Sequence, residues 1–309
     1  MKTFKINTTT VIDLPNINLA IGNFDGVHVG HQKIISQLVE HSRNNKNKSA
    51  ILSFAPHPRQ YFSNIYENFC IVDEKEKIRL LKNLNVDYYF SLQFDKSLAD
   101  YSAEDFVKII LYKKLNIKHL TVGYDFKFGK DRKGNLDLLK KLSSQYNFTI
   151  SVVNQVTNNI SEIYSSSLVR KNIQEGNFEK VSSLLLRNWN MRGKVIKGEQ
   201  RARKINFPTA NIKPDKLIKP KKGVYTIKAL FEEKYYCGIA NFGERPTVAG
   251  NTLLLEVHLF DFDQDIYGKE LTVEFLTFIR DEKKFDNFDI LTEQIQKDIE
   301  IAKKYHRVK

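Results

Sequence analysis

Two histidines and three glycines gather in one short segment near the start of the chain: Gly22-Asn23-Phe24-Asp25-Gly26-Val27-His28-Val29-Gly30-His31-Gln32. The apolar run from Ile17 to Ile21 precedes this segment and predicts a buried strand, and the residues after it have helical spacing. Glycines let a backbone approach a ligand closely, and a helix N-terminus offers N–H groups and a positive dipole end. His28 and His31 lie three positions apart and can face one ligand. The segment therefore predicts a phosphate site.

The surrounding elements alternate between strand-like and helix-like runs as far as Val153. The expected strands are 17–21, 50–54, 86–92, 119–122 and 148–153, and the expected helices are 32–43, 74–84, 103–115 and 136–146. Asp73 and Ser102 are placed to cap the second and third of these helices. Such alternation predicts a parallel sheet with right-handed crossovers, whose ligands bind beyond the carboxyl ends of the strands.

A stiff turn follows the second expected strand, where Phe54, Pro56, His57 and Pro58 stand together. The two prolines fit a simple strand terminator. The segment also resembles the F-x-P-H-P loop of a known enzyme family, which would form a preorganised pocket wall that needs little ordering on binding.

An aromatic segment, Gly123 to Gly134, follows the fourth expected strand. Tyr124, Phe126 and Phe128 alternate there with polar residues such as Asp125. A flat apolar ring system could stack on these aromatic side chains. Single-stranded nucleic acid could bind the same mixture of aromatic and basic residues, so both interpretations stand at this point.

A serine run precedes one more helical segment. Ser166 and Ser167 could simply cap this helix, and Arg170 could bind phosphate oxygens in a bidentate way. A further helix is expected over 177–186. The pattern then changes near Arg187 to short strands with turns, so we expect two domains, 1–186 and 187–309.

The second half predicts a small antiparallel β-barrel, closed or partly closed. Its expected strands are 191–196, 223–231, 235–241, 253–259 and 271–279, and an amphipathic helix over 287–304 is expected to pack across it. Strand alternation places Glu256 and His258 on one sheet face, opposite Leu255, Val257 and Leu259. A carboxylate in that position is commonly just solvated.

Composition narrows the class of protein. The chain has 309 residues, a net charge of +13 and 41% hydrophobic residues, which describes a globular protein that favours acidic partners such as nucleotides, nucleic acid or anionic lipid. Cys70 and Cys237 stand alone, so a disulfide framework and a cysteine zinc site are not expected. We see no signal peptide and no apolar run near the ~20 residues of a membrane helix. A cytoplasmic setting without membrane partners follows.

These motifs resemble those of the bacterial bifunctional riboflavin kinase/FAD synthetases. The pattern G-x-F-D-G-x-H-x-G-H resembles their nucleotidyltransferase signature, and 123–134 fills every fixed position of G-x-[DN]-F-x-F-G-x-x-R-x-G. The segment 163–170 matches I-S-S-T-x-I-R loosely, with Tyr164, Ser167 and Val169 as the differences. Segment 198–211 is similar to G-x-x-R-G-R-x-L-G-F-P-T-A-N, although Ala202 and Asn206 replace two glycines. Segment 238–247 matches G-x-A-N-x-G-x-R-P-T.

The resemblance implies an α/β fold class: a Rossmann-like nucleotidyltransferase domain followed by a riboflavin kinase-like barrel with a packing helix. It assigns catalysis to His28, His31, Arg170 and Glu256. ATP-binding residues would be Gly22, Asn23, Phe24, Gly26, His28, Gly30, His31, Ser166, Ser167, Arg170, Gly198, Arg203, Thr209 and Asn211. Flavin-binding residues would be Phe54, Pro56, His57, Pro58, Asp125, Phe126, Phe128 and Arg245. Thr209 and Asn211 would hold Mg²⁺, and Glu256 would accept the proton of the riboflavin 5′-hydroxyl.

The expected function is therefore phosphorylation of riboflavin to FMN, followed by adenylylation of FMN to FAD with release of pyrophosphate. Riboflavin, FMN, FAD and ATP are the implied partners, without nucleic acid. Two alternatives stay open. Ala202 and Asn206 could impair the kinase and leave only FMN adenylyl transfer, and the charge with the Tyr124–Phe128 loop could mark a nucleic-acid binder, which predicts salt-dependent binding.

Overall fold

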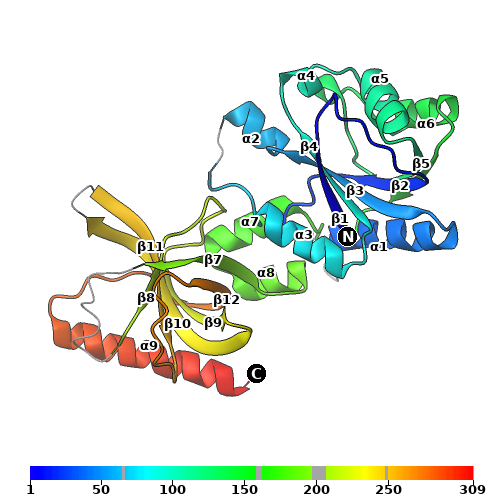
Figure 1. Cartoon of the computed structure of the whole chain (residues 1–309). Helices are drawn as coiled ribbons and strands as arrows, with labels where there is room; N and C mark the ends of the chain where they lie inside the picture. The colour runs from blue at the N-terminus through cyan, green and yellow to red at the C-terminus, as the bar shows by residue number, and fades with distance from the viewer. Residues whose placement is uncertain (65–66, 158–161, 197–206, 248–249, 309) are drawn as a thin grey trace. The chain divides into compact units, whose positions relative to one another are not determined.

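The computed structural model describes residues 1–64, 67–157, 162–196, 207–247 and 250–308. The chain forms two compact units, Met1–Ser166 and Ser167–Lys309 (Figure 1). The first unit is a parallel α/β sheet and the second a closed β-barrel, so the predicted fold class is confirmed.

The first unit is built on a six-stranded sheet in the order β1-β4-β3-β2-β5-β6, in which every pair is parallel. The strands are β1 (Lys2–Ile6), β2 (Ile17–Ile21), β3 (Lys48–Ala55), β4 (Tyr88–Gln93), β5 (Ile117–Gly123) and β6 (Thr149–Val153). Five of the six were predicted from apolar runs. The edge strand β1 was missed, because its polar, mostly exposed residues carry little apolar signal.

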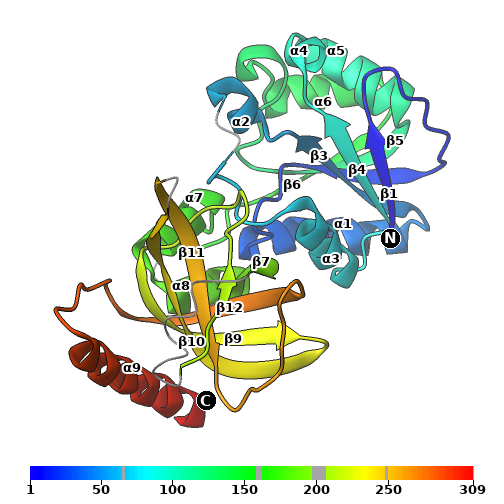
Figure 2. The ribbon, with the colours of Figure 1, turned by 60° about the vertical axis from the view of Figure 1, so that its left-hand side comes forward.

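Helices cover both faces of this sheet (Figure 2). α1 (Val29–Asn44) and α3 (Glu74–Asn83) bury apolar residues against one face, together with Ala20 and Ile51. α5 (Ala103–Asp105), the π-helix Phe106–Lys114 that continues it, and α6 (Leu136–Gln145) cover the other face. The short helices α2 (Pro58–Ser63) and α4 (Lys96–Ala99) follow β3 and β4 and were not predicted.

Helix caps form where the sequence placed them. Asp73 accepts a hydrogen bond from the Glu76 N–H and begins α3, and Ser102 accepts one from the Asp105 N–H and begins α5. Because β3 lies on one side of β2 and β5 on the other, the sheet reverses its strand order between β2 and β5. Ligands of open α/β sheets bind at such a switch point. Both glycine-framed segments, after β2 and after β5, lie there.

The second unit is a closed barrel in the order β10-β11-β8-β7-β12-β9, with antiparallel pairing throughout. Its strands are β7 (Trp189–Ile196), β8 (Ala210–Ile212), β9 (Gly223–Phe231), β10 (Lys234–Thr247), β11 (Gly250–Leu259) and β12 (Glu270–Arg280). The short strand β8 was not predicted. The helix α9 (Phe288–Val308) lies along the barrel as expected, where Arg280 pairs with the buried Asp298 at 2.8 Å.

The two helices that precede the barrel are α7 (Ser166–Glu175) and α8 (Phe178–Leu185). Phe178 is buried and stacks on Trp189 and Phe275, at ring distances of 5.7 and 5.0 Å. The compact units therefore divide at 166/167, whereas the sequence placed the division at 186/187. Helical periodicity continues the α/β pattern of the first half, but it does not show that the barrel buries the apolar face of α8.

Candidate active sites

The turn after β2 has an unusual backbone. Phe24, Gly26 and Val27 adopt φ values of 47°, 83° and 45°. A left-handed conformation is uncommon for any residue with a Cβ and strained for a β-branched one such as Val27. At Gly26 a Cβ would also lie 3.0 Å from Ile71 Cδ1. Strain of this kind persists only where surrounding contacts fix the backbone.

Several contacts fix this turn. The Asp25 carboxylate is 2% exposed and accepts hydrogen bonds from the Ile71 N–H, at 2.9 and 3.1 Å to its two oxygens, and from the Val72 N–H at 3.4 Å. Ser166 Oγ donates to the Asp25 carbonyl at 2.9 Å, and Ser53 Oγ donates to the Asn23 carbonyl at 3.2 Å. The glycine-rich turn is thus anchored from β3, from the segment before α3 and from the start of α7.

The two histidines meet at the start of α1. His28 caps the helix, and its Nδ1 accepts a hydrogen bond from the His31 N–H at 3.4 Å. The two imidazole rings stack at 3.7 Å, and Phe24 contacts His31 edge-on at 5.2 Å. Asn23 Oδ1, in addition, is buried and accepts no hydrogen bond within the described part of the chain. The turn therefore brings together both imidazoles, of which that of His28 is buried, a helix N-terminus and a buried acceptor without a donor among the described residues.

The segment after β5 forms an aromatic wall. Phe126 is half-buried and stacks on Phe128 at 5.3 Å, and Phe128 is buried against Phe106. Gly129 and Gly134 fit closely against Ala103, where a Cβ at either glycine would come within 3 Å. Phe126 thus offers a ring face and Phe128 supports it from the core.

The other predicted flavin-binding residues differ in their burial and in their contacts. Phe54 is half-buried and contacts Phe106, whereas Asp125 is exposed. His57 caps α2 by accepting a hydrogen bond from the Arg59 N–H at 3.1 Å, and Pro58 occupies the first turn of that helix. The 54–58 segment is therefore both the end of β3 and the start of α2.

The helix α7 crosses the division between the compact units. Ser166 lies in the first unit, in contact with the β2 turn, whereas Ser167 and Arg170 belong to the second.

A row of polar side chains crosses three strands of the barrel. Glu256 of β11 lies opposite Asn241 of β10 and opposite Asn211 of β8. Leu255 and Val257 are buried in the core, as the alternation predicted, so Glu256 projects from the outer face. Residues directly opposite each other share one face of a sheet, so these three side chains form one group.

Arg245 binds Glu256 directly. Its Nε donates to Glu256 Oε2 at 3.0 Å and a second guanidinium nitrogen donates to the same oxygen, while Nη1 lies 3.4 Å from Glu282 Oε1. Burial alone lowers the pKa of Arg245, but the hydrogen bonds and negative charges of Glu256 and Glu282 outweigh it and raise that pKa above its usual value. The guanidinium therefore stays charged between two carboxylates.

Sequence analysis did not find Glu282. It follows β12 in a charged run, and its carboxylate accepts from Asn241 Nδ2 at 3.4 Å and fills the space in which a Cβ at Gly243 would lie. Neither spacing nor residue type separates it from its charged neighbours. Only closure of the barrel brings it to the site.

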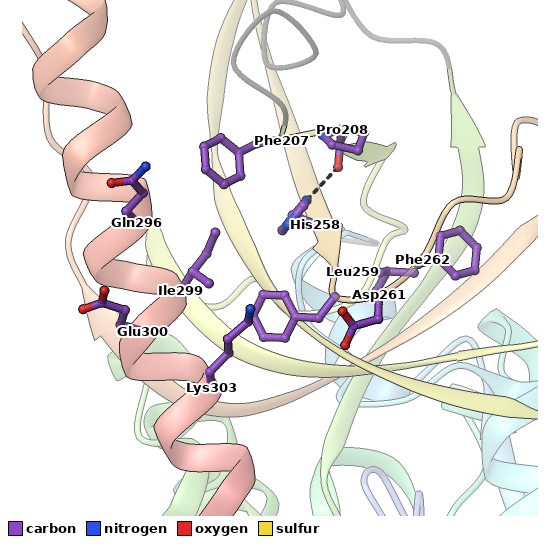
Figure 3. A pocket seen from close by; sticks show the side chains of 11 residues that line it. Phe207, Pro208, His258, Leu259, Asp261, Phe262, Gln296, Ile299, Glu300 and Lys303 are labelled. Atoms are coloured by element: carbon purple, nitrogen blue, oxygen red, sulfur yellow. Dashed lines mark hydrogen bonds between the residues drawn. The ribbon is translucent and has the colours of Figure 1, made fainter.

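A cavity of about 590 Å³ lies between the end of β11, from His258 onward, and α9 (Figure 3). Phe207, Phe260 and Ile299 give it apolar walls, and the Lys303 ammonium lies 5.4 Å from the centre of the Phe260 ring. His258 Nδ1 lies 2.9 Å from the Pro208 carbonyl, and Pro208 leads directly into Thr209 and β8. The predicted ATP residues Gly198 and Arg203, with Ala202 and Asn206, lie outside the described residues.

No helix of the described residues combines the length and apolar character that a membrane crossing requires. Among the same residues no group of three or more His, Cys, Asp and Glu side chains is arranged to hold a metal ion.

The fold and the two sites define an enzyme with a nucleotidyltransferase-type α/β unit and a separate β-barrel unit. The sequence model of the FAD synthetase family matches residues 12–167, and that of riboflavin kinase matches 185–306. Bifunctional riboflavin kinase/FMN adenylyltransferases from Haemophilus influenzae and Escherichia coli K12 are 38% and 37% identical, covering 93% of this chain and 93% and 92% of their own lengths. The chain belongs to this family.

The predicted activities are thereby confirmed: the chain is a bifunctional riboflavin kinase and FMN adenylyltransferase, and riboflavin, FMN, FAD and ATP are the molecules these activities imply. A crystal structure described as a macrolide-efflux protein from Streptococcus pneumoniae shares the fold. It is 30% identical with a TM-score of 0.87, covering 97% of this chain and 98% of its own.

Proposed function

We propose that the turn after β2 binds ATP for adenylyl transfer. The N-terminal N–H groups of α1 and the imidazoles of His28 and His31 stabilise charge on the α- and β-phosphates, and Arg170 holds the outer phosphates with Ser166 and Ser167. The unpartnered acceptor Asn23 Oδ1 fits a donor group of the nucleoside. Gly22, Phe24, Gly26 and Gly30 shape the backbone.

The flavin then stacks on Phe126, which Phe128 supports, while Phe54, Pro56, His57 and Pro58 bound the pocket and Asp125 contacts the ring from its exposed position. The FMN phosphate attacks the α-phosphorus of ATP, the bond to the β-phosphate oxygen breaks, and pyrophosphate leaves. An FMN phosphate is already anionic, so this step needs positioning and charge stabilisation rather than a general base.

At the barrel we propose that Glu256 accepts the proton of the riboflavin 5′-hydroxyl as this oxygen attacks the γ-phosphorus of ATP; the bond from that phosphorus to the β-phosphate oxygen breaks and ADP leaves. Arg245 orients Glu256 through Oε2, leaves Oε1 for the hydroxyl and lies beside the flavin. The cavity between the end of β11 and α9 fits the adenine of ATP, because its aromatic walls lead through Pro208 to Thr209, where Gly198 and Arg203 belong to the same ATP-binding motif.

Thr209 and Asn211 fit a Mg²⁺ site. Both offer neutral oxygen ligands, and Asn211 lies directly opposite Glu256. Because Mg²⁺ requires six oxygen ligands, phosphate oxygens and water would complete its shell. Bound Mg²⁺ supplies neutralisation of the phosphate charge. We also infer a cytoplasmic enzyme that acts on small molecules rather than on nucleic acid.

The observation that carries the kinase assignment is the contact of Arg245 with Glu256 in the row of Asn241, Glu256 and Asn211. The test is chromatographic analysis of products from riboflavin, ATP and Mg²⁺, with wild-type protein and His31→Ala. We expect wild type to form FMN and FAD, and His31→Ala to form FMN while losing FAD formation.

Loss of both activities in folded His31→Ala protein would overturn the division of labour. FAD formation by wild type only when FMN is supplied would contradict the kinase activity and favour the adenylyltransferase-only alternative, in which the replacements Ala202 and Asn206 impair the kinase.

A further inference from the structure

A second layer of polar groups lies behind the Gly22–His31 turn, and the reactions above do not use it. Lys77, in the second turn of α3, places its Nζ 3.3 Å from Ser53 Oγ of β3. Ser53 is fully buried, and its hydroxyl donates to the Asn23 carbonyl. A continuous chain of hydrogen bonds therefore runs from the ammonium of Lys77 to the backbone of the turn.

The surroundings of Lys77 show that its charge has local partners. Burial lowers the pKa of Lys77, while the nearby carboxylates of Asp25 and Glu74 and the thiol of Cys70 act to raise it. Glu74 itself is held by Ser91 Oγ at 2.6 Å. Withdrawing an ammonium from water costs stability unless it is paired, and an apolar side chain would fill the same space without that cost. A lysine at this buried position therefore indicates that its charged ammonium group, rather than its apolar stem, is what the structure requires here.

The turn needs anchors on both sides. Phe24 and Val27 hold left-handed conformations that their own side chains disfavour. The Asp25 carboxylate secures the middle of the turn to Ile71 and Val72, and Ser53 secures its start at Asn23. Lys77 reaches the hydroxyl of Ser53 and attracts Asp25, so a single cation supports both anchors.

We propose that Lys77 is a positioning residue for adenylyl transfer: through Ser53 and Asp25 it fixes the Asn23–Asp25 backbone, and with it the groups that face ATP. This inference rests on the proposed ATP site of the turn. It assigns Lys77 no contact with substrate and no proton transfer.

The test compares Lys77→Met, Lys77→Arg and the matched control Lys82→Met, which changes an exposed lysine of the same helix. We expect kcat/KM for FAD formation to fall about 10- to 100-fold in Lys77→Met, because a hydrogen bond from a charged group is lost. Lys77→Arg should recover much of this loss, and Lys82→Met should behave as wild type. Riboflavin phosphorylation, measured in the same preparations, should stay constant.

The arginine variant separates a charge role from a packing role. Methionine matches the lysine stem and lacks its charge, so a side chain that only fills space predicts methionine to be the better substitute. Equal activity of Lys77→Met and Lys82→Met, or an arginine variant no better than the methionine variant, overturns the proposal.

Ser53→Ala provides a second route that leaves the lysine in place. We expect Ser53→Ala to lose FAD formation as well, and the Lys77→Met/Ser53→Ala double variant to lose less than the product of the two single losses, because both changes weaken one chain of contacts. Losses that multiply in the double variant contradict the proposal. If Lys77→Met fails to fold, the Ser53→Ala protein provides the test, and FAD formation at the wild-type rate in it contradicts the proposal. If the His31→Ala protein still forms FAD, the proposed ATP site is wrong. If His31→Ala abolishes FAD formation while Lys77→Met forms FAD at the wild-type rate, the ATP site stands and only the role of Lys77 is overturned.

Discussion

In the function proposed above, the two sites would bind ATP with different parts of the chain. The first relies largely on backbone, a strained glycine-rich turn at the carboxyl edge of a parallel sheet and the N-terminus of α1, with the imidazoles of His28 and His31 beside it. The second uses side chains on the outside of a barrel, where Arg245 bridges Glu256 and Glu282. A parallel sheet collects its strand ends at one edge, whereas a barrel presents a row of facing residues across its strands.

This difference follows from the chemistry of the two nucleophiles. An FMN phosphate arrives charged, so its site needs only to hold and stabilise. A riboflavin hydroxyl must lose a proton, so its site needs a base and a group that orients it. Backbone N–H groups, together with imidazole and guanidinium side chains, fit the first task, whereas the second task requires a carboxylate base.

The largest expected effect tests the base. Glu256→Gln keeps the shape of the side chain and removes its ability to accept a proton, so riboflavin phosphorylation should fall about 10²- to 10⁴-fold. FMN adenylylation, assayed with supplied FMN, should be unchanged. A fall of less than about tenfold would show that Glu256 is not the base.

The next effect tests the backbone site. Gly26→Ala places a Cβ at φ 83° and 3.0 Å from Ile71, so FAD formation should fall about tenfold or more while phosphorylation continues. Gly268→Ala is the matched control: its φ is 75°, but nothing lies within 4 Å of the added Cβ.

Both rates should be kept in the Gly268→Ala protein. Equal rates in the Gly26→Ala and Gly268→Ala proteins would mean that the turn tolerates distortion, and the contrast between the two sites would weaken.

A smaller effect concerns the outer carboxylate of the barrel site. Glu282→Gln removes one of the two charges that hold Arg245, so phosphorylation should fall about two- to fivefold, as for other partly exposed ion pairs. Asp281→Asn changes the neighbouring carboxylate, which pairs with Lys221 at 2.7 Å instead, and should leave the rate unchanged. Steady-state kinetics of riboflavin phosphorylation by both variants provide the test. Equal losses in the two variants would mean that the rate depends on the net charge of this region and not on the contact between Glu282 and Arg245.

A last effect, on stability rather than on a reaction rate, separates the units by acid sensitivity. In the first unit His119 is buried, stacks on His41 and lies 2.7 Å from Thr149 Oγ1 through Nδ1. Burial, with the charge of His41, lowers the pKa of His119 from 6.5 to about 4. Between pH 4 and pH 6.5 the unfolded chain therefore binds more protons at His119 than the folded chain does. The contribution of His119 to the free energy of unfolding is fully present above pH 6.5 and declines as the pH falls toward 4.

Acidification from pH 7 to pH 5 should cost the first unit about 2 kcal/mol. Urea unfolding followed by circular dichroism reports this loss, and fluorescence of Trp189, the single tryptophan, reports the barrel separately. His119→Gln should flatten the pH dependence of the first unit. If the unfolding free energy of the first unit depends on pH in His119→Gln as it does in wild type, a group other than His119 causes the dependence.

Local pattern predicted much of the fold and part of each site. The strand-to-glycine-to-helix pattern found the turn at Gly22–His31, because strand, turn and helix are contiguous in the chain. Alternation along β11 likewise oriented Glu256. Contacts between distant segments could not be predicted from local pattern. Asp25 accepts hydrogen bonds from Ile71 and Val72, and Lys77 donates one to Ser53, only because the folded sheet brings these segments together.

The position of α8 has a practical consequence for dividing the chain. A barrel fragment that begins at residue 187 would lose Phe178 and expose the ring faces of Trp189 and Phe275 that it covers. Exposed aromatic surface of that kind promotes aggregation. A separately expressed kinase should therefore carry Phe178–Leu185 as its first helix, and a gene split in evolution would be expected to keep this helix with the barrel.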